Sequence, residues 1–439
     1  MTGRSSDLQT MTEQLERQLA RLGRQLGYLR RRSPFYQRKL GAAGVSGLRV
    51  RSLADLGRLP FTTKDELRES QLQAPPLGSH AAVDLRSVVR VHSSNGTTGQ
   101  PSWVGLTRRD VATWTAVTAD GLATEGLTAD DVVVHGASLG LFVGGIPFQD
   151  AAERIGATFV PIGTGASERA VMALRSLGAN ALHSTPSYAL YLAEYVREKY
   201  GIDPRALGVT KVLVGGEPGG GEAATRALIE QSWGARVTEG MGNADMAPVV
   251  FAECPARAGM HHTAGDHVLV ELVDPDSGAR LPWEPGLVGE LVYTATDREC
   301  CPLLRFRTGD RVEVLGVGCA CGRPGPRIRC VGRTDDMLIV LGVNVFPSAI
   351  RDVVSSLHPR MTGAMQVVLT RPGPRVEPPL RVVAEYGPDA TDLAALRTSV
   401  QSLIRARLTV AVEVELVPPD TLPRSEMKSR LVRRLYEGD

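Results

Sequence analysis

The chain has 439 residues, 43% of them apolar and 22% charged, and its 50 basic and 48 acidic residues leave a net charge of +2. This composition is typical of a folded globular protein and excludes a largely disordered one. The balanced charge does not favour a dedicated nucleic-acid or anionic-membrane surface, and no apolar run approaches the roughly 20 residues that span a bilayer. The polar N-terminal stretch is unlike a secretory signal. We therefore expect a cytoplasmic protein with no nucleic-acid or membrane partner.

The first predicted element is a helical stretch over residues 7–40, which Ser33-Pro34 interrupts because proline lacks a backbone donor. Its many arginines indicate a solvated surface helix, with a basic membrane-surface helix as the alternative. From residue 85 to 300, β-branched runs alternate with helical stretches, which predicts an α/β fold whose parallel-rich sheets are flanked by helices. The predicted strands are 88–91, 132–135, 158–162, 209–214, 249–252, 268–273 and 290–294, and the predicted helices are 108–125, 168–177, 186–200 and 221–232.

Beyond residue 335 the pattern restarts on a smaller scale. Strands are predicted at 365–370, 380–386 and 412–417, and helices at 347–357 and 391–407. This makes a compact α+β unit of ordinary domain size. We therefore expect a large N-terminal domain over residues 1–333 and a small C-terminal domain over residues 334–439.

A polar, glycine-containing loop directly follows the apolar run 88–91. Glycines let backbone N–H groups surround a phosphate, and nearby hydroxyls add donors. The spacing is not that of a Walker A loop. The loop therefore predicts a phosphate nest, with a polar hairpin turn as the alternative; the candidate residues are Ser93, Ser94, Asn95, Gly96, Thr97, Thr98 and Gly99.

Two further loops follow predicted strands, where ligands collect in α/β sheets. The first contains Gly215, Gly216, Glu217 and Pro218 and is a candidate nucleotide platform. The second ends at Asp310, whose carboxylate after a Thr-Gly turn can accept both hydroxyls of a ribose. A plain turn explains either loop when it is taken alone.

Two segments near the C-terminus complete the set. The charged stretch 332–347 lies at the expected domain boundary and suits a hinge, with a rigid turn as the alternative. Lys428 lies in a terminal loop from which it can swing into a cleft and balance charge on a transferring group. Only five of the chain's 50 basic residues are lysines, among them Lys64 and Lys428, so each lysine is a weak indication of a place where arginine does not serve.

Taken in order, these five segments resemble the adenylate-forming superfamily, and specifically the phenylacetate–CoA ligase family. Segments 33–36, 59–64 and 184–188 also resemble that family, so the resemblance covers nearly the whole chain. Its most specific part is the stretch GRTDDMLIVLGVNVFP at 332–347.

The resemblance implies a two-step reaction. A carboxylate attacks the α-phosphorus of ATP to give an acyl-adenylate and pyrophosphate; the small mobile domain then rotates about Asp335, and the thiol of coenzyme A displaces AMP. Positioned cations and N–H donors suit this chemistry because its transition state gathers negative charge.

The resemblance also implies the role of each candidate. Loop 93–99 would hold the β- and γ-phosphates, Glu217 and its neighbours would border adenine, and Asp310 would bind the ribose. Arg333 would lie near the ribose and phosphate, and Lys428 would bridge the substrate carboxylate and the phosphate. The expected cofactors are ATP (released as AMP), Mg²⁺ and coenzyme A.

The sequence departs from the family pattern at two places. Gln100 replaces a lysine of the phosphate loop. In the segment Glu239-Gly240-Met241-Gly242-Asn243-Ala244-Asp245, Glu239 stands where the family has an adenine-stacking tyrosine. Gly242 replaces the family's serine or threonine, and Asn243 replaces the Mg²⁺-binding glutamate. Asp245 supplies the missing carboxylate, Asn243 binds the metal weakly, or the protein handles a preformed acyl thioester; the sequence leaves these three open.

The acyl pocket implied by the resemblance is lined by His135, Leu139, Phe142, Tyr188, Gly215 and Met246. These side chains suit a flat aryl acid, and core packing explains them almost as well. We expect Glu239 to recognise an amino or hydroxyl substituent on the ring. The expected function is an ATP-dependent aryl-acid–CoA ligase. The alternatives are a relative that passes the acyl group to an amine, a nitrite-like nucleophile or a carrier protein, an ATP-independent acyltransferase, and a non-catalytic binding protein. A homodimer is left open.

Four residues form a candidate metal site: Cys254, His261, Cys319 and Cys321. Three thiols and an imidazole suit tetrahedral structural Zn²⁺, and some relatives resemble this pattern and bind zinc. His261 is preferred to His262 because it lies closer to the turn at Gly259. Free buried thiols are the alternative, and Cys300, Cys301 and Cys330 are expected in strands or the core.

Overall fold

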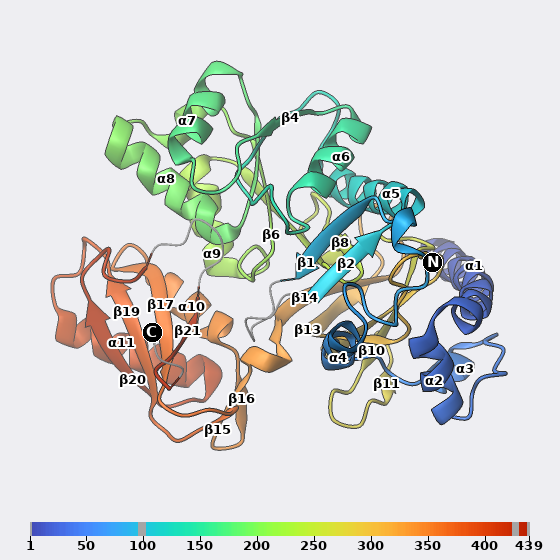
Figure 1. Cartoon of the computed structure of the whole chain (residues 1–439). Coiled ribbons are helices and arrows are strands. Elements are labelled where there is room, and N and C mark those ends of the chain that lie inside the picture. The colour runs from blue at the N-terminus through green and yellow to red at the C-terminus, as the bar shows by residue number, and fades with distance from the viewer. Residues whose placement is uncertain (1, 95–101, 424–429, 437–439) are drawn as a thin grey trace. The chain divides into compact units, whose positions relative to one another are not determined.

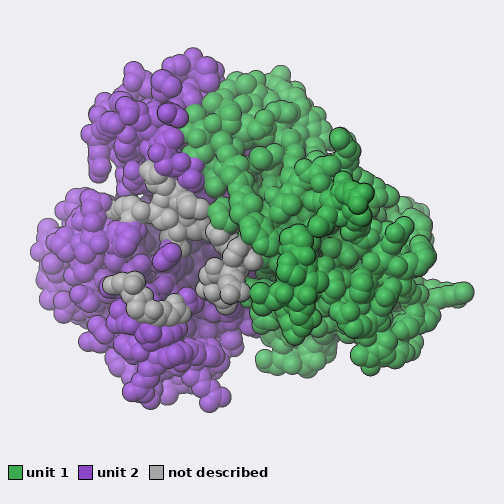
Figure 2. Space-filling model, in the orientation of Figure 1, with its two compact units in different colours: residues 1–163, 238–308, 312–329 green, residues 164–237, 309–311, 330–439 purple. Residues whose placement is uncertain are grey.

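The computed structural model describes residues 2–94, 102–423 and 430–436 (Figure 1). The chain divides into two units (Figure 2): unit 1 comprises residues 1–163, 238–308 and 312–329, and unit 2 comprises residues 164–237, 309–311 and 330–439. Each unit is described by itself below. Among the described residues, no helix is both long enough and apolar enough to cross a membrane.

The N-terminal helices of unit 1 pack through leucines spaced three and four residues apart. Helix α1 (Thr2–Arg32) stops before Pro34, as predicted, and α2 (Pro34–Ala42) begins there. Ser33 caps α2, because its Oγ accepts a hydrogen bond from the backbone N–H of Tyr36 at 3.4 Å. One face of α1 is buried against the first turn and the end of α2; the residues of this core include Leu19, Leu22, Leu26, Leu29, Tyr36 and Leu40.

Unit 1 combines a parallel pair with several antiparallel ladders. Strands β3 and β4 pair in parallel. The antiparallel pairs are β1–β2, β7–β8, β8–β9, β9–β14, β10–β11 and β10–β12. Among the described residues of this unit, the α-helices besides α1 and α2 are α3 to α6. The bounds are α3 (Leu53–Gly57), α4 (Lys64–Gln73), β1 (Arg90–Ser94), β2 (Ser102–Leu106), α5 (Arg108–Thr124), β3 (Val132–His135), α6 (Ile146–Ile155), β4 (Thr158–Pro161), β7 (Arg236–Asn243), β8 (Ala247–Glu253), β9 (Met260–His262), β10 (Val268–Val273), β11 (Arg280–Leu281), β12 (Val288–Ala295), β13 (Phe306–Val317) and β14 (Pro326–Arg333). Residues 236–237 of β7, 309–311 of β13 and 330–333 of β14 belong to unit 2.

Unit 2 contains a parallel pair, β5–β6, and a separate C-terminal sheet. That sheet has the strand order β20-β19-β17-β21, and its core includes Ile350 of α10 and Val400 of α11. A small sheet of order β16-β15-β18 lies earlier in the chain. The bounds are α7 (Ser167–Ser176), β5 (Ala181–Ser184), α8 (Pro186–Tyr200), β6 (Lys211–Gly215), α9 (Ala223–Trp233), β15 (Leu338–Val340), β16 (Val343–Val345), α10 (Pro347–Ser355), β17 (Met361–Leu369), β18 (Arg375–Val376), β19 (Leu380–Tyr386), α11 (Leu393–Leu408), β20 (Val412–Val417) and β21 (Val432–Arg434).

The predicted α/β class and the C-terminal α+β unit are confirmed. The pattern did not reveal strands β7, β9, β13 and β14, which account for much of the antiparallel share. In β7 the segment Glu239–Asn243 carries glycines at alternate positions, and glycine is depleted in strands because it offers no side chain to pack.

Candidate functional site

The predicted phosphate loop connects two antiparallel strands. Ser94 at the end of β1 pairs with Ser102 at the start of β2. This pairing matches the alternative interpretation, a hairpin, and does not exclude a phosphate nest. The residues Asn95, Gly96, Thr97, Thr98 and Gly99 lie outside the described part of the chain. The Oγ of Ser94 is buried and makes no hydrogen bond among the described residues. This hydroxyl is therefore available at the point where the loop begins.

The hairpin of β7 and β8 carries the segment that departs from the family. The side-chain Oδ1 of Asn243 accepts a hydrogen bond from the backbone N–H of Met246 at 2.8 Å, which closes a tight turn. Both carboxylate oxygens of Asp245 lie 2.6 and 2.7 Å from Lys64 Nζ. A Cβ at Gly242 would lie 2.5 Å from the carbonyl oxygen of Ala247, so no hydroxyl-bearing side chain fits there.

Glu239 lies on β7 and is buried. Burial raises the pKa of nearby Glu125 well above its ordinary value, and the charges of Glu253 and Glu239 raise it further. Gly240 keeps this packing possible, because a Cβ there would lie 2.6 Å from Glu125 Oε1. Position 239 therefore presents a carboxyl group in an acidic, buried environment instead of an aromatic ring.

In unit 2, the loop after β6 is held from two sides. The carboxylate of Glu217 accepts a hydrogen bond from the backbone N–H of Ser187 at 2.9 Å. Arg351 of α10 donates to the carbonyl oxygen of Pro218 and, at 3.0 Å, to the carboxylate of Glu222. Desolvation alone would lower the pKa of Arg351, but the charges of Glu222 and Glu217 outweigh it and the pKa is raised. The loop after β6 is thus anchored to α8 through Glu217 and to α10 through Pro218 and Glu222.

Three residues predicted from two motifs meet in unit 2. Arg333 Nη1 donates to Asp310 Oδ1 at 2.7 Å, and its Nε donates to Asp335 Oδ1 at 2.9 Å. Gly309 lets the guanidinium approach, because a Cβ there would lie 2.9 Å from Arg333 Nη2, and its φ of 76° favours glycine. Desolvation would lower the pKa of Arg333, but Asp310 and Asp335 raise it overall. Arg333 is therefore a permanent cation that couples the two carboxylates.

The predicted acyl-pocket residues differ in how far they are buried. His135 is fully buried, and its ring lies 5.0 Å from that of Phe159 and 6.1 Å from that of Phe148. Tyr188 is also fully buried, with its hydroxyl 3.2 Å from Ser167 Oγ. Both contacts fit core packing. Of the remaining candidates, Met246 is buried, and Leu139, Phe142 and Gly215 are partly exposed.

The four predicted metal ligands come together in unit 1. Their ligand atoms all lie within 4.8 Å of one another. Cys254 Sγ is 3.7 Å from Cys319 Sγ, and Cys321 Sγ is 3.6 Å from His261 Nε2. A tetrahedron with bonds of about 2.3 Å to sulfur has edges of about 3.8 Å, so these separations fit Zn²⁺. His262 is not one of the four residues whose ligand atoms cluster, and its ring instead lies 5.5 Å from that of Phe251.

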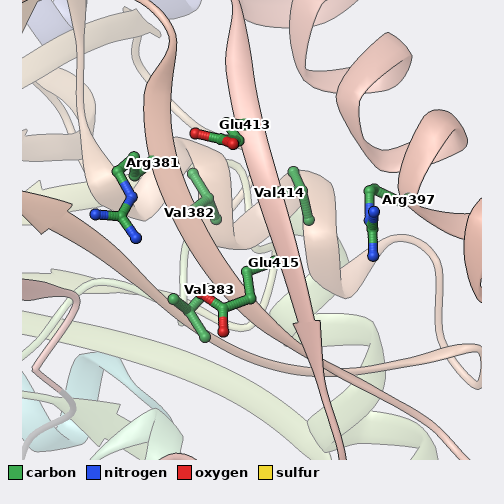
Figure 3. Close-up of a pocket in the computed structure, with 7 residues that line it drawn as sticks. All are labelled: Arg381, Val382, Val383, Arg397, Glu413, Val414 and Glu415. Carbon is green, nitrogen blue, oxygen red and sulfur yellow. The ribbon is translucent and has the colours of Figure 1, made fainter.

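A surface cavity of ≈ 280 Å³ lies at the edge of the C-terminal sheet (Figure 3). Arg381 and Glu413 are partners in the β19–β20 ladder there, and Arg397 comes from α11. The cavity has no aromatic lining residue and none of the predicted site residues. It therefore does not fit an aryl acid.

Sequence reasoning missed two residues that shape the site. Lys64 was noted as one of few lysines, but its partner Asp245 is distant in sequence. Arg351 is one of many arginines, and no local motif marks it. Each becomes visible only through the ion pair that it makes in the folded chain.

Comparisons with known proteins show the family to which the chain belongs. The family model described as AMP-binding enzyme matches residues 44–296, and that described as AMP-binding enzyme C-terminal domain matches residues 342–434. The chain is 36% identical to a phenylacetate-coenzyme A ligase of Thermus thermophilus, with 96% of each chain covered. It is 34% identical to a phenylacetate-coenzyme A ligase of Pseudomonas putida, which covers 94% of this chain and 92% of that one.

A solved structure gives the same result. The crystal structure of 2-hydroxyisobutyryl-CoA ligase in complex with 2-HIB-AMP is similar with a TM-score of 0.87 and 32% identity, covering 95% of this chain and 88% of the other. The identity over nearly the full length and the two matched family models show that the chain belongs to the phenylacetate–CoA ligase family of AMP-binding enzymes.

Proposed function

We propose that this protein activates an aromatic carboxylic acid as its acyl-adenylate, at the expense of ATP, and then transfers the acyl group to the thiol of coenzyme A. Its membership of the phenylacetate–CoA ligase family supports an AMP-forming acid–CoA ligase. The observation that carries the proposal most directly is the meeting of Asp310, Arg333 and Asp335. A carboxylate held by a permanent cation is well placed to accept the hydroxyls of a ribose. We also propose a cytoplasmic location, where ATP and coenzyme A are abundant.

The residues of this chain would divide the work as follows. Ser93, Ser94 and the loop that follows would donate hydrogen bonds to the phosphates, and Glu217 with its fixed loop would border the adenine. Lys428, which lies outside the described residues, would balance charge between the substrate carboxylate and the α-phosphate. Such preorganised donors lower the barrier because negative charge grows in the transition state. Asp335 would be the pivot of the C-terminal domain, residues 334–439, between the two half-reactions.

Mg²⁺ binding is part of this proposal. The carboxylate of Asp245 is engaged by Lys64, and Asn243 Oδ1 is engaged in its turn. The Asp245 carboxylate and Asn243 Oδ1 both retain lone pairs that can bind a hard cation. When bound, Mg²⁺ would neutralise phosphate charge. Lys64 would hold Asp245 in place, so that the altered segment still supports adenylation.

Pyrophosphate release tests the function. We expect release to be sustained with ATP, an aryl acid and coenzyme A together, with a thioester as the product. The panel includes phenylacetate, an aminobenzoate and 2-hydroxyisobutyrate, and Glu239→Gln should weaken only the substrates that carry an amino or hydroxyl group. An absence of release with every acid would contradict the proposal in favour of an ATP-independent acyltransferase or a binding protein. Thioester formation on a carrier protein, with none on coenzyme A, would show that the acceptor is the carrier protein.

Lys428→Ala separates the two half-reactions. We expect the variant to lose adenylation by two or more orders of magnitude, because an electrostatic stabiliser of the transition state is removed. Thioester formation from a supplied acyl-adenylate should remain close to wild type. Lys199→Ala, at an exposed position, is the matched control and should leave both steps unchanged. Full first-step activity in Lys428→Ala would refute the role of the lysine.

We further propose that Cys254, His261, Cys319 and Cys321 hold a structural Zn²⁺. The donor set and the spacing support this, and a closed four-ligand site suits a structural role. Elemental analysis should find about one zinc per chain, and Cys319→Ser should lose it and unfold at lower denaturant concentration. Cys330→Ser, which removes a thiol outside the cluster, should keep the metal. Zinc-free wild-type protein with unchanged stability would contradict the site.

A further inference from the structure

Two adjacent cysteines lie outside both the nucleotide candidates and the metal cluster. Cys300 and Cys301 follow β12, are buried at 0% and 3% exposure, and have their sulfur atoms 3.6 Å apart. They pack with Leu77 and Trp103 in a small apolar cluster of unit 1. Their backbone is pinned, because the N–H of Cys300 donates to Asp110 at 2.9 Å and its carbonyl accepts from Ala82 at 2.7 Å. The two thiols therefore face each other from a fixed backbone.

We propose that Cys300 and Cys301 form a redox modification site, which hydrogen peroxide converts reversibly into a disulfide between adjacent residues. The Cys301 thiolate attacks one peroxide oxygen, the O–O bond breaks, and a sulfenic acid forms with release of the other oxygen as water. The Cys300 sulfur then attacks the sulfenic sulfur and displaces a second water. Two thiols are thus oxidised by two electrons, and one peroxide is reduced to two waters.

The surroundings of the pair assign the two roles. Hydrogen bonds from Cys300 and then from His80 lower the pKa of Cys301. The hydrogen bond between the two thiols raises the pKa of Cys300. His80 is itself anchored, with Nδ1 3.1 Å from Ser70 Oγ. Cys301 is therefore the attacking sulfur and Cys300 the resolving one. A small neutral oxidant is required, because neither sulfur is exposed enough to meet a bulky disulfide.

The product of this reaction would be labile. Adjacent Cα atoms are about 3.8 Å apart, whereas ordinary disulfides join Cα atoms roughly 4.4 to 6.8 Å apart. Such a bond is strained, and strained disulfides are reduced easily and serve as regulatory bonds. The pair thus suits a reversible mark better than a structural cross-link.

Oxidation would also reach the strand pair that carries the phosphate loop. A Cβ at Gly105 of β2 would lie only 2.8 Å from Cys300 Sγ, and Gly105 pairs with Val91 of β1. The Cys300 sulfur therefore occupies space that the absence of a side chain at Gly105 leaves open. Closing the two sulfur atoms to bonding distance must move at least one of them, and we expect this shift to disturb the packing under β2. This consequence rests on the proposed function, and we expect oxidised protein to release pyrophosphate several-fold more slowly until a thiol reductant is added.

Peptide mapping tests the site independently of activity. Trypsin cleaves after Arg298 and Arg305, so peptide 299–305 contains Cys300 and Cys301 and no other cysteine. Zinc-loaded protein is treated with a small excess of hydrogen peroxide, blocked with iodoacetamide and digested. We expect this peptide to be unalkylated and lighter by two hydrogens, and to regain two alkylatable thiols after reduction. Peptide 330–333, which contains Cys330 alone, is the matched control and should stay alkylated.

Two variants sharpen the result. Cys300→Ser should leave a Cys301 sulfenic acid that dimedone traps, and Cys301→Ser should leave Cys300 alkylated. Full alkylation of peptide 299–305, under peroxide that already oxidises Cys319 and Cys321 in peptide 312–327, would overturn the proposal. Irreversible sulfinic acid at Cys301 in the wild type would overturn it as well. Failure of the proposed function would abolish the pyrophosphate readout only and would leave the peptide masses unchanged.

Discussion

At the scale of single residues, the ion pair of Lys64 and Asp245 connects an N-terminal helix of unit 1 to the segment that departs from the family. The Asp245 side chain is 8% exposed and that of Lys64 is 24% exposed. The carboxylate is thus largely removed from water, and the ammonium group is its closest compensation. Removing the lysine leaves a buried charge without this partner, which is more costly than leaving a partly hydrated lysine alone.

A double-mutant cycle measures this pair. We expect Lys64→Met to lower the free energy of unfolding by about 2 to 3 kcal/mol and Asp245→Asn by about 1 kcal/mol, with a coupling of about 1 to 2 kcal/mol. Urea denaturation of the four proteins provides the values. The pair of Lys199 and Glu168, 3.6 Å apart and exposed on both sides, serves as the control and should show no measurable coupling. Additive effects at Lys64 and Asp245 would mean that the pair is not a functional unit.

At the scale of elements, helix α9 obtains its N-terminal cap from another helix. The side chain of its own N-cap residue Glu222 accepts no capping hydrogen bond from the backbone of the first turn. Instead, Asp352 of α10 accepts a hydrogen bond from the backbone N–H of Ala224 at 2.9 Å. A carboxylate at this end also interacts favourably with the helix dipole. The neighbouring Arg351 holds Glu222 and the loop before α9, so α10 fixes both the helix and the nucleotide-loop candidate.

Removing this cap should therefore weaken α9. We expect Asp352→Ala to lower the free energy of unfolding by about 1 kcal/mol, the ordinary value of an N-cap. Hydrogen exchange should accelerate in the first turn of α9 more than in α8. Asp389→Ala, which changes an exposed aspartate of the same unit, should leave exchange in α9 unaltered. Equal protection of that turn in both variants would show that the contact does not stabilise the helix.

Elements of regular pattern were predictable, and those with a special local cause were not. Strands β3, β10, β19 and β20 have the predicted bounds because their β-branched runs leave one choice of structure. Strand β7 escaped because its glycines serve close backbone approaches, which no periodicity reports. The turn at Asn243 also has a local cause, the hydrogen bond that its side chain accepts. This turn is evident only in the structure, where the register of β7 with β8 shifts between Met241 and Asn243.

The candidate site divides in the same way. Asp310, Arg333 and the cysteine cluster lie in short motifs with recognisable chemistry. Their candidate roles could therefore be predicted before their contacts were known. The partners of Lys64 and Arg351 come from segments far away in the chain, and a single sequence holds no record of such pairing. The degree of burial was also unreadable for Tyr188 and His135, because an aromatic residue packs equally well around a ligand or around the core.

At the scale of the whole molecule, buried histidines make stability depend on pH. Burial lowers the pKa of His183 from 6.5 to about 4. Below pH 6.5 the unfolded chain binds a proton that the folded chain does not bind until the pH approaches 4. Proton binding therefore lowers the free energy of the unfolded state relative to the folded state as the pH falls through this window, and above it the effect vanishes.

We expect the contribution of His183 to cost about 2 kcal/mol of stability between pH 6.5 and about pH 5. Urea denaturation at both pH values, in wild type and His183→Gln, measures the difference. The variant should show a smaller loss on acidification, because its side chain does not titrate. A loss of equal size in both proteins would assign the acid sensitivity to other groups.

The crowding at Gly242 has a practical consequence for anyone who wishes to give this enzyme a relative's selectivity. A side chain introduced at position 242, as the family has it, would clash with the carbonyl oxygens of the facing strand. This single replacement fails on its own, before further replacements in the segment can compensate for it. The workable unit of engineering is the complete β7–β8 hairpin, grafted together with the lysine that anchors its tip.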